Sequence, residues 1–126
     1  MAIYLKTQIT SVGPDVSDLA EGGVVILFAD GAPPELSEVS VLHRPEAGPT
    51  EEAPKVGEPI TIGAIETRIT AVGETAWKKV VDLGHVVVNF NGDVSTERPG
   101  EICAAIVDCG ALKAALAVGE TITIGA

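Results

Sequence analysis

A nine-residue segment that occurs twice is the feature that most constrains the fold of this chain. Residues 56–64 read VGEPITIGA and residues 118–126 read VGETITIGA, so the two copies differ only at Pro59 and Thr121. A recurrence of this length within 126 residues indicates that the chain consists of two related halves. Any fold that the chain adopts must therefore accommodate this segment at two equivalent places.

Further matches extend the duplication over most of the chain. The matched segments are Ile9–Gly13 with Ile69–Gly73, Val24–Phe28 with Val86–Phe90, and Glu38–His43 with Glu101–Ile106. The offset grows from 60 residues (9 to 69) to 62 residues (56 to 118), which places a two-residue insertion in the second half. We predict one domain over residues 1–126, with internal repeats at approximately residues 9–64 and 69–126.

The composition favours strands as the building blocks of both halves. Hydrophobic residues make up 46% of the chain but aromatic residues only 3%, so Val, Ile, Leu and Ala must form the core. Half of the chain is too small to bury an apolar face alone, whereas two halves packed together can do so. We therefore predict an all-β fold: a duplicated, pseudo-twofold closed β-barrel of roughly eight short strands with minor helices.

Hydrophobic periodicity and the positions of Gly and Pro give the expected elements. Strands are predicted at residues 3–12, 24–28, 38–43, 60–62, 65–72, 85–90, 102–107 and 121–124. Short helices are predicted at residues 15–21 and 74–82, and a helical turn or loop at residues 110–118. The Pro-rich and acidic residues 44–55 are predicted to form a long polar loop.

Charge and cysteine content exclude several classes of function. A formal net charge of −10 disfavours nucleic acid and anionic membrane surfaces and favours a basic protein partner, although acidity can also serve solubility alone. Cys103 and Cys109 have no neighbouring His and form no CxxC motif, so no metal or cofactor is expected. Neither a signal peptide nor an apolar segment of membrane-spanning length is evident, which predicts a cytoplasmic protein with reduced thiols.

The duplication also separates residues that the fold requires from residues that one site requires. On the overlay, His43 corresponds to Ile106 and His85 to Gly23, so the fold requires neither histidine. His43 ends a predicted strand beside Arg44, at the start of the polar loop. A histidine in this setting can be a general base, a metal ligand, a nucleophile or only a structural residue. Among the functional roles, a nucleophile that accepts an activated phosphoryl group fits best, with the Arg44 guanidinium stabilising the phosphate, whereas a lone histidine is more often only structural.

Two groups of residues together are characteristic of a known family. The first group is Ile26–Phe28, Gly31–Pro33, Glu35, Leu36, Glu38 and Val41–His43. The second group is Gly63, Ile69–Gly73, Leu83–Val86, Phe90–Gly92, Pro99 and Gly100. These residues resemble the IIA component of the glucitol/sorbitol-specific sugar phosphotransferase system, and the resemblance covers the chain from Ile3 to Gly119.

The resemblance implies a cytoplasmic phosphocarrier, which is a phosphoryl-transfer component with a phosphohistidine intermediate. It implies that His43 accepts the phosphoryl group from the protein HPr and passes it to the IIB domain of a IIB/IIC sugar transporter. His85 lies in the Leu83–Val86 block and is expected to support the site. Residues 44–55 match no part of the family pattern, and the role of Arg44 rests on guanidinium chemistry alone.

Two other classes of function compete with the phosphocarrier. One is a non-catalytic regulatory or binding module on the same β-barrel, and burial of His43 under apolar neighbours would favour it over a carrier with an exposed histidine. The other is a sugar-binding barrel, which is disfavoured because one Trp and one Tyr offer little aromatic surface for a sugar ring.

Overall fold

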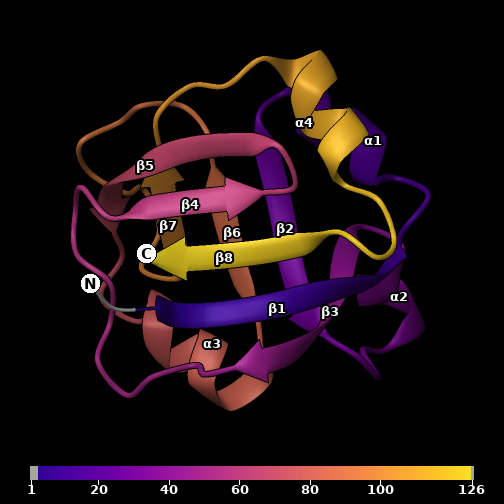
Figure 1. Ribbon diagram of the computed structural model, residues 1–126, viewed down its shortest axis with the longest axis horizontal. Coiled ribbons are helices and arrows are strands. Elements are labelled where there is room, and N and C mark those ends of the chain that lie inside the picture. The colour runs from indigo at the N-terminus through magenta and orange to yellow at the C-terminus, as the bar shows by residue number, and fades with distance from the viewer. Residues whose placement is uncertain (1–2, 126) are drawn as a thin grey trace.

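Eight strands form a closed barrel in the computed structural model, which describes residues 3–125 (Figure 1). The strands are β1 (Ile3–Val12), β2 (Val24–Ala29), β3 (Ser40–Ala47), β4 (Pro59–Ile62), β5 (Ile65–Val72), β6 (Val86–Asn89), β7 (Glu101–Ala104) and β8 (Thr121–Gly125). Their order around the barrel is β1-β3-β2-β6-β7-β5-β4-β8, and an antiparallel β1–β8 ladder closes the ring. The predicted all-β barrel is confirmed.

The strand order has a twofold pattern. Exchanging β1 with β5, β2 with β6, β3 with β7 and β4 with β8 leaves the order around the barrel unchanged. The pairs β2–β3 and β6–β7 are parallel, and the other ladders are antiparallel. The strands of the two nonapeptides, β4 and β8, pair with each other, with Thr61 opposite Thr123. Ala126, at the end of the second nonapeptide, lies outside the described residues.

The ladders correct the sequence overlay at His43. On β3, His43 pairs with Ile9 of β1, and at the equivalent place on β7, Ala104 pairs with Ile69 of β5. The expected counterpart Ile106 is therefore wrong by two residues, and it lies beyond the end of β7. The overlay matched Glu38 with Glu101, but Glu101 begins β7 whereas Glu38 precedes β3.

The ladders also correct the overlay at His85. Ile26 and Val87 hold equivalent places on β2 and β6, because each pairs with the first residue of the following parallel strand. Counting back two residues, the counterpart of His85 is Val24 rather than Gly23. Neither histidine has a histidine as its counterpart, so both remain asymmetric.

Short helices close the two ends of the barrel (Figure 1). They are α1 (Val16–Glu21), α2 (Pro34–Ser37), α3 (Ala76–Leu83) and α4 (Cys109–Ala115). Helix α2 was not expected, and Pro34 at its first position explains it, since proline is compatible with the first helical turn. Strand β3 continues to Ala47 by pairing with β1, so the beginning of the predicted polar loop is a strand. No helix within residues 3–125 has the length and apolar character needed to cross a membrane.

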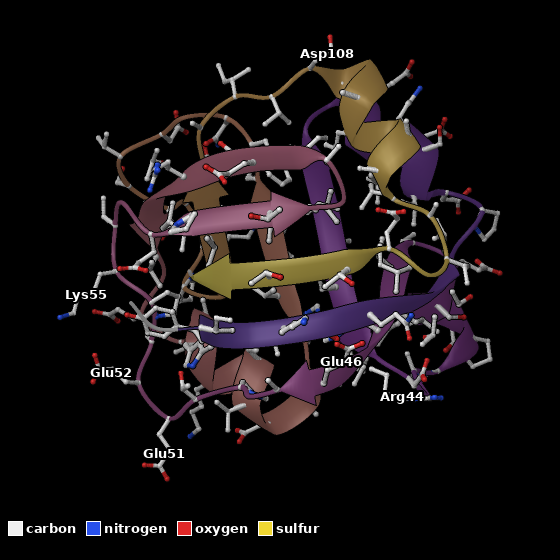
Figure 2. The ribbon with its side chains drawn as sticks, in the orientation of Figure 1. Arg44, Glu46, Glu51, Glu52, Lys55 and Asp108 are labelled. Atoms are coloured by element: carbon white, nitrogen blue, oxygen red, sulfur yellow. The ribbon has the colours of Figure 1, made fainter. Side chains whose placement is uncertain are left out.

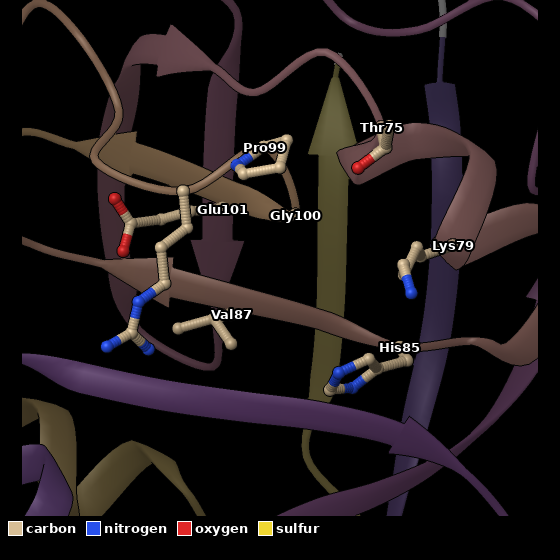
Figure 3. A pocket seen from close by; sticks show the side chains of 8 residues that line it. Thr75, Lys79, His85, Val87, Pro99, Gly100 and Glu101 are labelled. Carbon is tan, nitrogen blue, oxygen red and sulfur yellow. The ribbon is translucent and has the colours of Figure 1, made fainter.

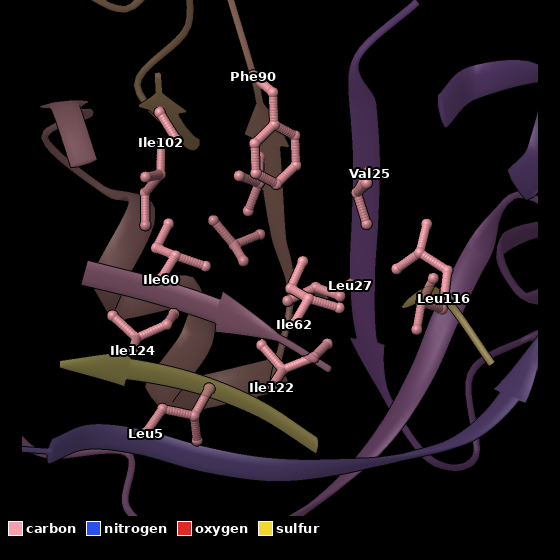
Figure 4. Close-up of a cluster of buried hydrophobic side chains, with 14 of the residues drawn as sticks. Leu5, Val25, Leu27, Ile60, Ile62, Phe90, Ile102, Leu116, Ile122 and Ile124 are labelled. Atoms are coloured by element: carbon pink, nitrogen blue, oxygen red, sulfur yellow. The ribbon is translucent and has the colours of Figure 1, made fainter. Parts of the chain in front are cut away.

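Branched aliphatic side chains fill the barrel interior, as the composition predicts. The close-up in Figure 4 shows side chains from opposite walls meeting in the interior, among them Leu5, Leu27, Ile60, Ile102 and Ile122. All of these side chains are buried. The alternation of buried and half-buried residues along β4 and β8 follows the two-residue period of a strand.

Candidate functional site

His43 lies on β3 and points into the barrel. Val41 and His43 are buried while Leu42 between them is only half-buried, so the strand turns Val41 and His43 inward. The His43 side chain is among the largest that are fully enclosed, with an exposed fraction of 1%. The two-residue period of a strand predicts that His43 shares a face with Val41, and the structure agrees.

Both ring nitrogens of His43 have a polar partner. Nε2 lies 2.7 Å from the Gly84 carbonyl oxygen, and Nδ1 lies 2.7 Å from the Thr7 hydroxyl oxygen. A carbonyl oxygen can only accept, so Nε2–H donates to Gly84. In the neutral ring Nδ1 then accepts a hydrogen bond from the Thr7 hydroxyl. These two bonds compensate the imidazole for its loss of water.

The enclosure sets the protonation state of His43. Burial lowers the pKa of His43 below its ordinary value of 6.5, because a charged ring loses more hydration than a neutral one. The hydrogen bond to Gly84 and the charge of Asp30 oppose this shift, but burial is the larger effect. The ring is therefore neutral at pH 7 and retains a nitrogen lone pair.

Gly84 ends helix α3 and brings its carbonyl to His43. Its backbone is left-handed, with φ of 64° and ψ of 22°. A Cβ atom at this position would lie 2.7 Å from the Ala29 Cβ, and Ala29 is the partner of His43 in the β2–β3 ladder. Both the dihedral angles and the close approach to β2 require glycine here. We call Gly84 and His85 together the cap turn.

His85 lies next to His43 through this cap turn. Its Nδ1–H donates to the Leu27 carbonyl oxygen at 3.0 Å, and its ring lies 5.1 Å from the Phe28 ring at an angle of 40°. The side chain is half-buried on the outer face of the barrel. The structure thus brings the two histidines to one turn, where Gly84 links them.

Arg44 lies on the other face of β3 from His43. Its guanidinium forms an ion pair with Asp30 at 2.9 Å, and the Thr10 hydroxyl also donates to Asp30. The Arg44 side chain is 75% exposed and extends into solvent (Figure 2). Because neighbouring residues of a strand face opposite ways, the structure does not place Arg44 at the His43 ring.

Three residues of this site were missed at the sequence level. Thr7 is a polar residue on the apolar face of β1, between Leu5 and Ile9, and this break in the pattern was a usable signal. Gly84 was interpreted only as the end of a helix. Asp30 belongs to a turn cluster and gave no signal of its own.

Other chemistry has less support. Cys103 is buried, and burial together with Glu101 raises the pKa of its thiol to about 11, so it is protonated and unreactive at pH 7. Both cysteines are free thiols. Within residues 3–125, no three metal-ligating side chains gather into a group that could hold a metal ion.

Comparisons with known proteins agree with the family resemblance seen in the sequence. A profile of the PTS system glucitol/sorbitol-specific IIA component family matches residues 4–123. Glucitol/sorbitol-specific EIIA components from Shigella flexneri and Escherichia coli (strain K12) are each 31% identical over 105 residues, which is 83% of this chain and 84% of theirs.

A solved structure extends the similarity to the fold. The crystal structure of a PTS system IIA component from Enterococcus faecalis V583 aligns with a TM-score of 0.72 over 96% of this chain and 99% of that one, at 17% identity. With residues 4–123 matching the family profile and two relatives above 30% identity, the chain belongs to the glucitol/sorbitol-specific IIA component family of the sugar phosphotransferase system.

Proposed function

We propose that this chain is a cytoplasmic phosphocarrier in which His43 carries the phosphoryl group. His43 accepts it from phospho-HPr and passes it to the IIB domain of a IIB/IIC glucitol/sorbitol transporter. In the first transfer the phosphorus–nitrogen bond of phospho-HPr breaks as the bond from phosphorus to the His43 nitrogen forms. In the second transfer that phosphorus–nitrogen bond breaks as phosphorus bonds to the nucleophile of IIB, and each leaving group retains the electron pair. The observation that carries the proposal is a neutral, oriented imidazole at a place where the other half of the barrel has Ala104.

The geometry favours Nε2 as the phosphorylated atom. Nδ1 faces the barrel interior and is bonded to Thr7, which is itself buried. Nε2 faces the cap turn, where its partner is a backbone carbonyl in a partly exposed position. For Nε2 to attack, the ring proton must reside on Nδ1 and donate to the Thr7 hydroxyl oxygen, which can accept as well as donate.

Transfer requires the cap turn to move. With the His43 side chain 1% exposed, a donor imidazole cannot approach Nε2 while the Gly84 carbonyl covers it. The turn follows the last residue of a short helix, and such segments open at low cost compared with the barrel strands. Opening breaks the hydrogen bond between His43 and Gly84 and the bond between His85 and Leu27, and it makes Nε2 accessible to the phosphoryl group.

Arg44 and His85 take supporting roles in this proposal. Arg44 is one residue from the acceptor but on the other face of β3, so its guanidinium must leave Asp30 and reach around the strand to bind phosphoryl oxygens. His85 fixes the cap turn through its bond to Leu27 rather than accepting phosphate itself.

The second candidate function is a non-catalytic regulatory or binding module on the same barrel. The burial of His43 is the observation that favours it. The polar partners of Nδ1 and Nε2 argue against a purely structural histidine. An apolar residue would fill the same space without needing two hydrogen-bond partners.

Phosphorylation of His43 is tested by labelling with phosphoenolpyruvate, Enzyme I and HPr. We expect one acid-labile, base-stable phosphate per chain, absent in His43→Ala and retained at a reduced rate in His85→Ala and Arg44→Gln. Phosphorus NMR of the product identifies the phosphorylated nitrogen. Absence of label in the unaltered protein, or full label in His43→Ala, would rule out the carrier and leave the binding module.

A further inference from the structure

A hollow of about 250 Å³ lies on the outer face of the barrel, beside the cap turn. It is lined by Val87 of β6, by Lys79 of α3 and by Thr75, which precedes that helix, and the segment before β7 contributes Arg98. Figure 3 shows the Thr75, Lys79 and His85 side chains on one side of this hollow and Pro99 and Glu101 on the other. We call it the basic hollow.

The basic hollow gathers cations that have no carboxylate partner. Of the eight Lys and Arg residues, four form ion pairs, namely Lys6, Arg44, Arg68 and Lys113. Three of the other four are Lys78, Lys79 and Arg98, and no ion pair is formed by any of them within residues 3–125. Lys79 and Arg98 line the basic hollow, and Lys78 lines an adjoining hollow that shares Thr75 and Lys79.

This clustering is unexpected in a chain with a formal net charge of −10. With carboxylates in such excess, random placement would give most cations an acidic neighbour. Cations that lie close together without forming ion pairs repel one another, and an anion bound between them removes that repulsion. Asp82 lines the adjoining hollow but forms no ion pair with either lysine in the described part of the chain.

Uncharged polar groups complete the basic hollow. Thr75 precedes α3, but its hydroxyl makes no hydrogen bond to the helix, and Lys79 follows one turn later on the same helix face. His85 uses Nδ1 for the Leu27 carbonyl, so its Nε2 can accept from a phosphate hydroxyl when neutral or donate to a phosphate oxygen when protonated.

One carboxylate, Glu101, also lines the basic hollow. It is only 6% exposed, and it accepts from the Glu97 backbone N–H at 3.3 Å and from the Cys103 thiol at 3.6 Å. Its charge therefore reduces the positive potential of the hollow without neutralising both Lys79 and Arg98.

We propose that the basic hollow binds the phosphate group of a small phosphate monoester. Lys79 and Arg98, which both line the hollow, provide charge-assisted hydrogen bonds, and Thr75 and His85 provide directional ones. The volume lies below the roughly 300–1,000 Å³ of pockets for drug-sized ligands, which limits the ligand to a few heavy atoms beyond the phosphate. The site is distinct from the barrel interior that holds His43, and its occupancy does not depend on phosphoryl transfer.

The test is an NMR titration of the isotope-labelled protein at constant ionic strength. Inorganic phosphate, glycerol 3-phosphate and uncharged glycerol are the three probes. We expect saturable shifts at Thr75, His85 and Gly100 with both phosphate-containing probes and none with glycerol. Tighter binding of glycerol 3-phosphate shows that the polyol part is also recognised, and equal binding shows that the phosphate alone is recognised. Either order supports the site.

Variants that each remove one positive charge distinguish binding in the basic hollow from a general effect of net charge. Lys79→Gln and Arg98→Gln should each weaken binding by about tenfold, the size of one charge-assisted hydrogen bond. Lys55→Gln removes the same charge from a cation on the long loop, away from the basic hollow, and should leave binding unchanged (Figure 2). The proposal is overturned if no probe gives saturable shifts, or if Lys55→Gln weakens binding as much as Lys79→Gln.

Discussion

At the scale of single residues, the site lies where one half of the barrel has His43 and the other half has Ala104. Thr7 and Thr67 hold equivalent places on β1 and β5, and each uses its hydroxyl in a hydrogen bond. Thr67 donates to the Ala105 carbonyl at 3.0 Å, whereas Thr7 bonds to the His43 ring. Both halves of the barrel thus have a threonine at this position. In the first half the threonine hydroxyl bonds to the His43 imidazole instead of to a backbone carbonyl.

Replacing Thr7 with valine should destabilise the protein while preserving the shape of the side chain. The His43 Nδ1 would lose its buried partner, which costs about 1–3 kcal/mol of the free energy of unfolding. Urea denaturation measures this cost, and Thr7→Ser, which keeps a hydroxyl, should recover most of it. A Thr7→Val protein as stable as the unaltered one would show that the hydrogen bond contributes nothing.

The low pKa of His43 gives stability a predictable dependence on pH. Burial holds the folded-state pKa below 6.5, so between these two values the unfolded chain binds more protons than the folded one. The contribution of His43 to the free energy of unfolding is therefore fully present above about pH 6.5 and is lost as the pH falls towards the folded-state pKa.

A comparison with His43→Gln isolates this effect from the titration of the many carboxylates. Urea denaturation at a series of pH values should show the unaltered protein losing stability relative to His43→Gln below about pH 6.5. Parallel profiles for the two proteins would mean that burial does not shift the pKa of His43.

At the scale of elements, helix α3 acts as the cover of the site. It buries Ala76, Trp77 and Val80 against the barrel and ends at Gly84, whose carbonyl lies over His43. The equivalent helix of the first half, α1, is two residues shorter. The offset between equivalent residues is 60 at Ile9 and Ile69 and 61 at Ile26 and Val87, so one of the two inserted residues lies in the segment that carries α3 and the cap turn.

Gly84→Ala should be more damaging than alanine at another left-handed glycine. Gly57 has φ of 96° and open space around its Cβ direction, so Gly57→Ala incurs only the backbone cost of about 1–2 kcal/mol. Gly84→Ala adds a clash with the Ala29 Cβ, for a further cost of about 1–3 kcal/mol. Thermal or urea denaturation of both variants checks the difference, and equal losses would contradict the close packing of the cap turn on β2.

At the scale of the whole molecule, negative charge should steer the approach of a basic donor. Eighteen acidic residues outnumber eight basic ones, and Glu46, Glu51 and Glu52 lie on the same side of the barrel as Arg44 (Figure 2). Attraction between surfaces of opposite charge speeds association and weakens as salt screens it over about 10 Å.

Charge variants on two sides of the barrel test this steering. Phosphoryl transfer from HPr should slow as salt increases, and Glu51→Gln should slow it more than Asp108→Asn, which lies across the barrel (Figure 2). Asparagine at position 108 still accepts the hydrogen bond from the Ala111 N–H that begins α4, so its charge is the main change. Equal effects of the two variants would indicate that net charge alone matters.

The barrel could be predicted well because both the duplication and the strand periodicity can be read directly from the sequence. All eight expected strands exist, and the two-residue period of residues 39–43 predicts that His43 shares a face with Val41, as it does in the structure. The exact partners across the barrel were less predictable. The overlay aligned identical residues, Glu38 with Glu101. The register of the strands depends on backbone hydrogen bonds between them, which a single sequence does not reveal.

The site was only partly predictable for a related reason. His43 was found because it broke the symmetry, but its partners come from β1 and from the end of α3, which are distant in sequence. Gly84 contributes through its backbone carbonyl, which every residue has. The contact depends on a left-handed turn pressed against Ala29, and only the folded chain shows that.

The β1–β8 ladder has a consequence for synthesis of the protein. Strand β1 leaves the ribosome before the other strands of the barrel, but one of its two edges pairs with β8, which emerges more than one hundred residues later. Until then that edge of β1 exposes unpaired backbone groups, a known route to association between nascent chains. We infer that the barrel closes only after translation of β8, so that ribosome-bound chains lacking β8 should depend on chaperones that shield strand edges.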